Sequence, residues 1–358
     1  MNSLNLNKAG LFAVVLVILL MGSWEIYLHS QGNKISYDDG KELWADKRAM
    51  VYEPIDKATV FIGSSRNKYD IDIDTWQDAT NEHVIQLAVE GNSPLPILDD
   101  LANDTKFKGK LVVDVTERLF FSTRQNNIGE PKENVAYYKE RTPAQRCSFK
   151  INHILESQFV FLDRNYFALN SFFNNIKIPK RKGIFEPPFE YPMEAARIRF
   201  DRQNYMLPGF LTDMVSRNKV KAIWEFYEKR NKERPAVGNR LDSFFNAIKT
   251  SVDKIKVRGG MVLFVRTPSS GYYWALDTQN FPRDKYWDKL ISYVSCEGIH
   301  FKDYEDIAHF ECPEWSHLSQ PQAIIFTKKI VEILKQEKSW KFSQKQTTVL
   351  NNINLKKF

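Results

Sequence analysis

The chain has 358 residues, 43% of them hydrophobic and 13% aromatic, which is enough to bury the core of one large domain or two modest ones. Its formal net charge of +7 is spread along the sequence in short clusters such as residues 177–182, with no finger, aromatic RNA platform or long basic arm beside them. We therefore expect no nucleic-acid partner, and a surface suited to anionic lipid headgroups or an anionic polymer.

An uncharged, apolar stretch lies near the N-terminus at residues 10–24, and apolar character resumes after Glu25. About 19 residues of helix suffice to cross a bilayer, which would leave Glu25 near the far headgroups. Because no small-x-small cleavage site follows, an uncleaved anchor is preferred to the alternative, a cleaved signal peptide. We predict one membrane-spanning helix within residues 1–29, a cytoplasmic N-terminus, and an extracytoplasmic chain after about residue 30.

Residues 30–57 are polar and mixed, and we expect them to form a stalk with one short helix. Apolar runs with strand composition follow, each beside turn residues, at 58–63, 83–89, 110–115, 261–265 and 299–301. Helical patterns lie between and after them, at 96–101, 220–227, 241–248 and 320–336. Strands that alternate with helices predict an α/β fold with a parallel sheet.

A long segment that is rich in aromatic and basic residues separates the third and fourth predicted strands. We interpret its central part, about 122–240, as a large, mostly helical insertion within a single extracytoplasmic domain at 58–338. The Gln- and Asn-rich residues 339–358 are predicted to be a loose polar tail.

Three cysteines, Cys147, Cys296 and Cys312, leave at least one thiol unpaired. A disulfide between Cys296 and Cys312 would brace the loop before His317, whereas two buried free thiols are the alternative, and the sequence leaves both open. No Cys/His cluster has the spacing of metal ligands, so we expect neither a metal nor a cofactor.

Two serines follow the first predicted strand, in the turn Gly63-Ser64-Ser65-Arg66. Open α/β sheets place their ligands at the carboxyl ends of strands, and a serine at the start of a helix also gains from the positive end of that helix. Taken alone, Ser64 or Ser65 is equally well explained as a helix N-cap.

A second motif, Glu314-x-x-His317, lies on a short loop near the C-terminus, just before a predicted helix. A carboxylate three residues before a histidine can fold back to the imidazole, fix its tautomer and stabilise the imidazolium that forms when it takes a hydroxyl proton. Ser65 lies at the other end of the domain. The chain order therefore predicts the nucleophile, Ser65, first, and its acid and base, Glu314 and His317, last.

These motifs resemble those of the SGNH or GDSL hydrolases. Gly63-Ser64-Ser65 matches the family's Gly-Asp-Ser block, Gly91 looks like the glycine of its second block, and Glu314-x-x-His317 matches its Asp-x-x-His. The resemblance implies a three-layer, flavodoxin-like parallel sheet and acyl transfer through a Ser65-His317-Glu314 triad. It also implies that the backbone N–H groups of Ser65 and Gly91 hold the oxyanion.

One departure from the family concerns its third block, where an asparagine amide completes the oxyanion hole. This chain has Val115-Thr116-Glu117 at that place. We consider Thr116 or Asn92 as the substitute donor. A missing donor of this kind typically costs about 2.7–4 kcal/mol of transition-state stabilisation.

The Gly-Ser-Ser-Arg form with an N-terminal anchor is similar to one branch, the membrane-tethered SGNH-like partners of membrane-bound O-acyltransferases in teichoic-acid alanylation and polysaccharide acetylation. That resemblance implies an O-acyltransferase or esterase at the cell membrane, acting on a cell-envelope polysaccharide or polymer beside a membrane-bound O-acyltransferase. The alternative is a non-catalytic adaptor that keeps the fold and recruits the acyltransferase, and the absent asparagine favours it.

Further candidates lie near the same sheet edge. Arg66 follows the proposed nucleophile and Arg266 ends the fourth strand, so each is a candidate for binding an anionic or carbonyl group. A salt bridge with a neighbouring acid is the alternative for both. The aromatic run Tyr272-Tyr273-Trp274 would suit a sugar, or is ordinary packing.

Overall fold

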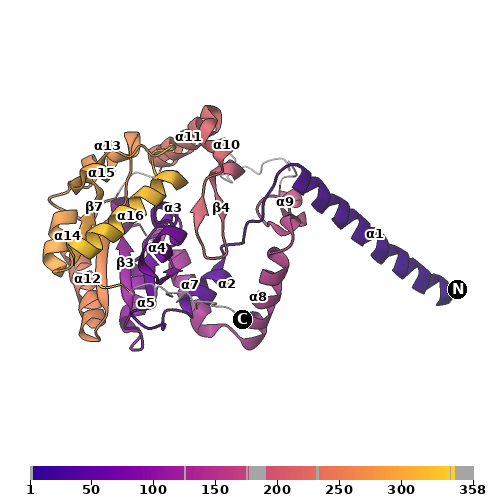
Figure 1. Cartoon of the computed structure of the whole chain (residues 1–358), viewed down its shortest axis with the longest axis horizontal. Coiled ribbons are helices and arrows are strands. Elements are labelled where there is room, and N and C mark those ends of the chain that lie inside the picture. The colour runs from indigo at the N-terminus through magenta and orange to yellow at the C-terminus, as the bar shows by residue number, and fades with distance from the viewer. Residues whose placement is uncertain are drawn as a thin grey trace, which may run out of the picture.

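A five-stranded parallel sheet forms the centre of the protein (Figure 1). The computed structural model describes residues 3–124, 126–174, 176, 191–230, 234–338 and 340–342. Numbered in chain order, the strands lie in the order 2-1-3-4-5, which is the order of flavodoxin-like doubly wound sheets. Across the sheet they are β2(His83–Gln86), β1(Ala58–Ile62), β3(Lys110–Asp114), β6(Met261–Arg266) and β7(Glu297–His300).

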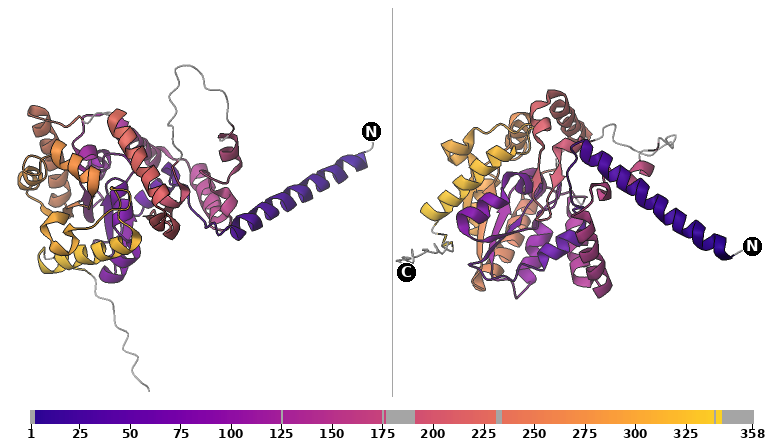
Figure 2. Two further views of the ribbon diagram at one scale, coloured as in Figure 1. Left: turned by 90° about the horizontal axis from the view of Figure 1, so that it is seen from above. Right: turned by 45° about the vertical axis from the view of Figure 1, so that its right-hand side comes forward.

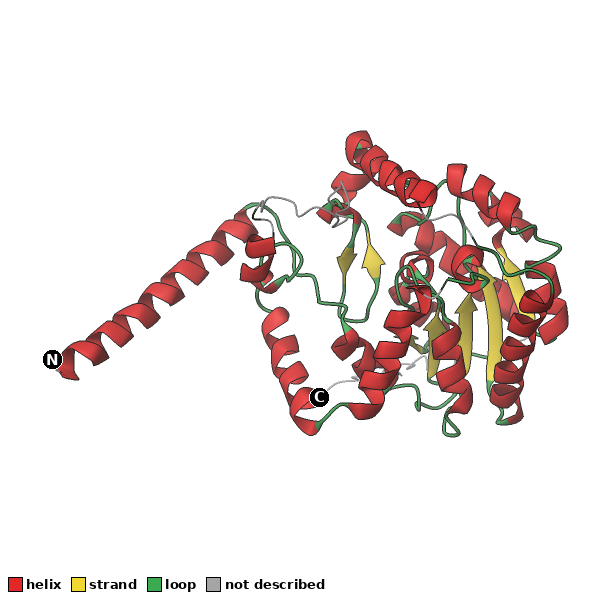
Figure 3. Cartoon of the chain, turned by 180° about the vertical axis from the view of Figure 1, so that it is seen from behind, coloured by secondary structure: helices red, strands yellow, loops and turns green. Residues whose placement is uncertain are grey.

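Side chains of successive strand residues enter different hydrophobic cores, one on each face of the sheet. Val60 and Ile62 pack in one core and Phe61 in the other, as the two-residue repeat of a strand requires. The first face is covered by α5(Leu95–Asn103), α12(Asn239–Val257) and α14(Trp287–Val294), and the second by α3(Ser65–Asp70), α4(Ile73–Thr80) and α16(Gln320–Gln336) (Figure 3). The predicted α/β fold with a parallel sheet is confirmed, and its layers are helix, sheet and helix.

The described residues between β3 and β6 are mostly helical, in agreement with the predicted helical insertion. They also contain a short antiparallel pair, β4(Arg197–Ile198) and β5(Asn204–Tyr205). Besides α12, the described helices of this segment are α6(Glu117–Phe120), η1(Asn126–Ile128), α7(Gly129–Glu140), α8(Pro143–Glu156), η2(Val160–Leu162), α9(Leu169–Asn174), η3(Met193–Ala195), α10(Pro208–Thr212) and α11(Met214–Arg230). The basic cluster at 177–182 lies outside the described residues.

The C-terminal part completes the sheet and its cover. It comprises β6, α13(Gly271–Asn280), α14, β7, η4(Phe301–Asp303), α15(Glu305–Ala308) and α16. Of the predicted tail at 339–358, the structure describes residues 340–342, and Trp340 among them is buried in the core beside α16.

Residues 34–57, predicted as part of a stalk, pack onto the domain instead. They contain the expected short helix, α2(Lys41–Arg48), in which Trp44 is fully buried and donates its indole N–H to the carbonyl of Leu87 at 2.9 Å. Arg48 pairs with Asp100 of α5 at 2.8 Å. The segment is therefore an integral layer of the domain.

The N-terminal helix α1(Ser3–Ser30) projects away from the domain (Figures 1 and 2). Its 25-residue segment Leu6–Ser30 contains an 18-residue window with a mean hydropathy of 2.2, and it is long and apolar enough to cross a membrane. The last turns of α1 contact the domain: Leu28 is buried, and the Glu25 carboxylate accepts the backbone N–H groups of Val160 at 2.8 Å and Phe161 at 3.0 Å.

All three cysteines are free thiols. Cys296 packs against the core that contains α12 and α14, whereas Cys312 belongs to the core beneath α16. Because these two cores lie on opposite faces of the sheet, the disulfide considered between Cys296 and Cys312 does not form.

Candidate active site

Ser65 lies at the carboxyl end of β1, in the first turn of α3. Ser64 is the N-cap, and its hydroxyl oxygen accepts the backbone N–H of Arg66 at 3.4 Å. Gly63 is required by close packing, because a Cβ there would lie 2.6 Å from the Cβ of Asp114. Either serine hydroxyl could have been the nucleophile by sequence. The Ser64 hydroxyl caps α3, whereas the Ser65 hydroxyl faces the cavity described below.

The structure brings Ser65, His317 and Glu314 together in one hydrogen-bonded chain. The Oγ of Ser65 lies 2.8 Å from Nε2 of His317, and Nδ1 of His317 lies 2.8 Å from Oε1 of Glu314. Ser65 is half-buried, whereas His317 and Glu314 are buried. With a proton on Nδ1 donated to Glu314, Nε2 is free to accept the Ser65 proton.

The Glu314 carboxylate has donors on both oxygens. Oε1 also accepts the backbone N–H of His317 at 2.7 Å, and Oε2 accepts the indole N–H of Trp224. Burial alone would raise the pKa of the Glu314 carboxyl, but the charge of His317 and these hydrogen bonds outweigh burial and hold the pKa below its usual value. The ionised form that orients the imidazole is therefore favoured.

Two aromatic side chains hold the imidazole in place. Tyr69, one helical turn after Ser65, stacks on His317 with ring centroids 4.3 Å apart, and its hydroxyl donates to the carbonyl of Ala195 at 3.0 Å. Trp224 of α11 approaches the imidazole edge-on at 6.4 Å. The insertion thus supplies one wall of the site and one hydrogen bond to Glu314.

Asp70, the last residue of α3, fixes the loop that carries His317. Its Oδ1 accepts the backbone N–H of Leu318 at 2.8 Å, and its Oδ2 has no hydrogen-bond partner among the described residues. Burial raises the pKa of Asp70 well above its usual value, although the hydrogen bond from Leu318 opposes that effect. Helix α3, which carries Ser65, and the loop that carries His317 are therefore joined by a hydrogen bond to the backbone as well as by the contact between the two side chains.

A cavity of about 580 Å³ opens beside Ser65 and His317, at the carboxyl ends of β1 and β3. This volume is in the range of small-molecule sites. Its walls are mainly aromatic and charged: Tyr69, Tyr191, Trp224, Tyr227 and Tyr273, together with Arg66, Glu90, Arg118, Arg124 and Glu228. Such a lining can stack a sugar ring and hydrogen-bond its hydroxyls.

Of the four predicted oxyanion donors, Ser65, Gly91 and Thr116 line the cavity and Asn92 does not. Gly91 lines the cavity with φ of +64°, and its backbone N–H and that of Ser65 donate no hydrogen bond within the described part of the chain. Thr116 also lines the cavity, but its hydroxyl contacts Asp114 at 3.0 Å and Ser64 at 2.8 Å. Asn92 does not line the cavity, because its amide donates to the carbonyl of Glu90 at 2.7 Å and to Glu130 at 3.1 Å.

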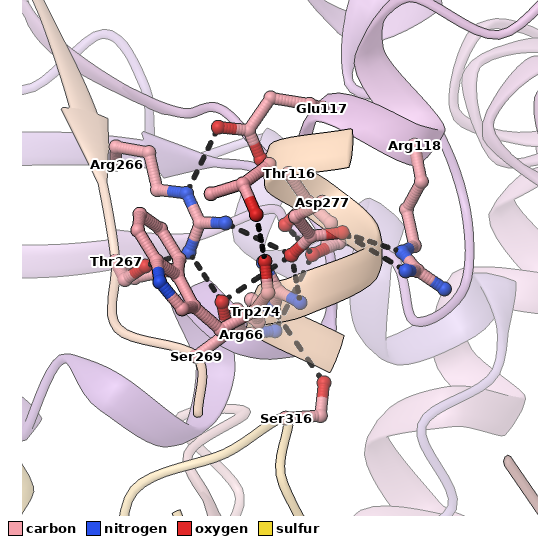
Figure 4. Close-up of polar contacts among 12 residues, drawn as sticks. Arg66, Thr116, Glu117, Arg118, Arg266, Thr267, Ser269, Trp274, Asp277 and Ser316 are labelled. Atoms are coloured by element: carbon pink, nitrogen blue, oxygen red, sulfur yellow. Dashed lines mark hydrogen bonds and ion pairs between the residues drawn. The ribbon is translucent and has the colours of Figure 1, made fainter. Parts of the chain in front are cut away.

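Asp277 of α13 joins three arginines beneath the cavity (Figure 4). Its carboxylate accepts from Arg66 at 3.1 Å, Arg118 at 3.0 Å and Arg266 at 2.9 Å. Burial alone would raise the pKa of Asp277, but the three guanidinium groups outweigh burial and hold that pKa well below its usual value. Asp277 is therefore a buried anion shared by three cations.

The two arginines predicted to bind substrate, Arg66 and Arg266, both pair with Asp277. Arg266 does not line the cavity: it is buried between Glu117 at 2.9 Å and Asp277, which is the salt-bridge alternative. Arg66 does line the cavity, yet it also pairs with Asp277 and lies 3.5 Å from the hydroxyl of Ser316. Arg66 thus connects the Asp277 cluster to the residue before His317.

The aromatic run at 272–274 is divided among three environments. Tyr273 lines the cavity, Tyr272 packs beside Trp315, and Trp274 packs edge-on against Phe301 at 5.2 Å. Ordinary packing therefore accounts for two of these three side chains.

Three important residues were missed by the sequence reasoning: Tyr69, Trp224 and Asp277. Tyr69 carried a usable signal, because residues i and i+4 share one face of a helix and Tyr69 is four residues after Ser65. Trp224 and Asp277 carried none, because each reaches the site across a tertiary contact.

No protein-family model matches the chain, and the curated proteins contain no match. Among the described residues, no group of three or more His, Cys, Asp or Glu side chains is arranged to hold a metal ion. A hydroxyl, an imidazole and an ionised carboxylate in sequence are suited to nucleophilic catalysis, in which the imidazole takes the hydroxyl proton.

Proposed function

We propose that this chain is a membrane-anchored serine acyl-transfer enzyme, either an O-acyltransferase or an esterase, with Ser65 as nucleophile. The observation that carries the proposal is the chain of contacts from Ser65 through His317 to Glu314, each 2.8 Å long. Its SGNH-like motifs, the strand order of the sheet and the position of Ser65 at the carboxyl end of β1 support the same reading.

The reaction begins when His317 accepts the Ser65 proton on Nε2 and the Ser65 Oγ attacks the acyl carbonyl carbon. The C=O electron pair moves onto oxygen, and the backbone N–H groups of Ser65 and Gly91 stabilise that oxyanion. His317 then gives the proton to the leaving group as the tetrahedral intermediate collapses to acyl-Ser65. In the second half, His317 takes the proton of the acceptor hydroxyl, whose oxygen attacks the acyl-Ser65 carbonyl. The bond to Ser65 Oγ then breaks, and His317 returns the proton to that oxygen.

The acceptor is water for an esterase, or a hydroxyl of a cell-envelope polysaccharide or polymer for a transferase. Aromatic walls favour a sugar, and an extracytoplasmic domain beside α1 would meet such polymers at the membrane surface. A membrane-bound O-acyltransferase is the proposed partner and acyl source.

The oxyanion hole in this proposal has two backbone donors, because the Thr116 hydroxyl is engaged by Asp114 and Ser64. One further donor is typically worth about 2.7–4 kcal/mol, or roughly 10²–10³ in rate. We therefore expect acyl transfer to be slower than in three-donor relatives of the same chemistry.

A serine-directed fluorophosphonate probe tests the proposal on the full-length chain in detergent. Wild type is expected to be labelled and Ser65→Ala is expected to lose the label. Ser243→Ala, an exposed serine of α12, is the matched control and should label as wild type. Absence of labelling in a correctly folded wild type would instead favour the adaptor alternative, which the occupied Thr116 hydroxyl also favours.

A further inference from the structure

Helix α8 has an exposed apolar stripe. The stripe consists of Ala144, Cys147, Ile151, Ile154 and Leu155, which recur at intervals of three and four residues and so share one face of the helix. Ile151 is 55% exposed and Ile154 is 62% exposed, and no residue of α8 is buried. Contiguous exposed apolar side chains of this kind mark interaction sites rather than ordinary surface.

Local sequence, rather than core packing, makes this segment a helix. Thr142 is the N-cap, and its hydroxyl accepts the backbone N–H of Gln145 at 3.3 Å while the Gln145 side chain accepts the Thr142 N–H at 2.7 Å. Pro143 follows at the first helical position. A helix formed without burial keeps its apolar stripe available.

The opposite face of α8 holds it on the domain and fixes its orientation. His153 stacks on Phe200 with ring centroids 3.6 Å apart, and Phe149 stacks beside His153 at 6.3 Å. Gln145 and Asn152 face a hollow whose other wall includes Lys41 and Glu42 of α2. The apolar stripe is therefore directed away from the domain.

The stripe lies beside the helix that is apolar enough to cross a membrane. In both views of Figure 2, α8 lies on the side of the domain from which α1 projects, and η2 contacts both helices. The chain runs from α8 into η2, whose first two backbone N–H groups are held by Glu25 of α1. Phe159, between α8 and η2, is itself 38% exposed.

Basic residues border the stripe. Arg146 and Lys150 are exposed, and at 100° per residue they lie on the same side of the stripe, Lys150 about 40° and Arg146 about 80° beyond Ile154. A helix with an apolar face, a polar face and lysine or arginine at the boundary is the type that lies in the headgroup region of a bilayer. Anionic headgroups would complement these two cations.

We infer that α8 is an interfacial helix that lies on the surface of the bilayer crossed by α1, with the apolar stripe at the boundary between headgroups and acyl chains. The inference rests on the proposed anchoring by α1. Together the two helices attach the domain at two places, so that the catalytic cavity keeps one orientation to the membrane surface.

Spin labels on the full-length chain in nanodiscs of phosphatidylcholine and phosphatidylglycerol test the inference. Cys147 lies in the stripe and is exposed, so it accepts a label directly once Cys296 is replaced by alanine. We expect the Cys147 label to collide more often with oxygen than with a water-soluble nickel chelate. A label at Ser243→Cys in Cys147→Ala/Cys296→Ala, on the exposed surface of α12, is the matched control and should show the reverse.

Two further variants keep the outcomes distinct. Ile151→Asp with Ile154→Asp should return the Cys147 label to water while Ser65 labelling by the fluorophosphonate is unchanged, because neither side chain is buried. A label at Leu16→Cys in Cys147→Ala reports whether α1 is in the bilayer. A lipid-exposed Leu16 label with a water-exposed Cys147 label overturns the α8 inference alone, even if Cys147 becomes protected in native membranes by a protein partner.

Discussion

Gly63 sets the position of Ser65 by having no side chain. A Cβ at residue 63 would lie 2.6 Å from the Cβ of Asp114 and 3.0 Å from that of Asn67, so any side chain would push the end of β1 away from β3. Ser65 is two residues further along, and its Oγ has to stay 2.8 Å from His317. At the scale of single residues, the proposed chemistry depends on a close backbone approach.

Glu314→Gln removes the negative charge of the side chain and keeps its shape. Gln retains an acceptor for His317 but loses the charge that stabilises the imidazolium, so we expect fluorophosphonate labelling of Ser65 to slow by on the order of 10³–10⁴-fold. Labelling rates measured against wild type give this number. Trp224→Phe keeps the aromatic wall and removes one donor to Glu314, so its loss should be smaller. An unchanged rate in folded Glu314→Gln would contradict the proposed role.

Asp70→Asn tests the buried carboxyl beneath the His317 loop. Because the pKa of Asp70 is raised on folding, the folded state retains a proton that the unfolded state releases, and the stability of wild type falls as pH rises above about 3.9, the usual Asp value. Asn has no such titration and still offers an oxygen to the Leu318 N–H.

Urea unfolding of both proteins measures the effect of Asp70. Asp70→Asn should be more stable than wild type at about pH 7, and the difference should shrink toward about pH 4, since the unfolded Asp then also binds its proton. A difference that does not change with pH would show that Asp70 is ionised in the folded protein.

At the scale of elements, the Asp277 cluster joins parts that are distant in sequence. Arg66 belongs to α3, Arg118 to α6, Arg266 to β6 and Asp277 to α13. All four side chains are buried where they meet, and Arg66 and Arg118 also line the cavity. The cluster thus fixes the relative positions of the elements that carry the cavity lining.

Asp277→Asn should therefore destabilise the domain strongly. It leaves three buried guanidinium groups without their shared anion, and removal of one partner from a buried ion pair typically costs about 3–5 kcal/mol. Asp242→Asn is the matched control, because its pair with Lys289 is exposed and should be worth less than about 1 kcal/mol. Urea denaturation of both variants gives the two values, and equal losses would contradict the structural role.

Elements were predictable where their signal is local. The strands are short apolar runs that end at turn residues, and α16 begins at a Ser-Gln-Pro start and spans the predicted 320–336. Residues 30–57 were predicted as a stalk because their composition is polar, but α2 buries Lys47 and Arg48 as well as Leu43, Trp44 and Ala45. The hydrogen bond from the Trp44 indole to the Leu87 carbonyl is a tertiary contact, and it produces no periodic pattern in the sequence.

The same division holds for the site. Ser65 and the pair Glu314 and His317 could be predicted, because a turn after a strand and a three-residue spacing are both visible in one sequence. The Trp224 donor and the Asp277 cluster could not be, since their partners are 90 residues or more away in several cases and are chosen by packing. That the Thr116 hydroxyl and the Asn92 amide are both engaged by neighbours was also hidden, because it depends on the tertiary surroundings of each side chain.

At the scale of the whole molecule, α1 and the domain are coupled through one carboxylate. Glu25 holds the N–H groups of Val160 and Phe161, and Leu28 is buried beside them. Glu25→Ala should free both amides, and hydrogen bonds to a charged group are worth about 1.5–3 kcal/mol each. We expect hydrogen exchange at residues 160–161 to speed up by roughly 10–100-fold. Exchange at wild-type rates would show that α1 is not fixed to the domain through Glu25.

The indole that Trp224 contributes has a consequence for any shortened version of this protein. A shortened chain that kept only the five strands and their covering helices would retain Ser65, His317 and Glu314. It would lack α11, and Glu314 would lose the indole donor that α11 supplies. Water would then compete for the Glu314 oxygen that the indole had bonded. The distribution of protons among Ser65, His317 and Glu314 would shift as a result. The insertion between the third and fourth strands is thus part of the candidate active site, and engineering should keep it intact.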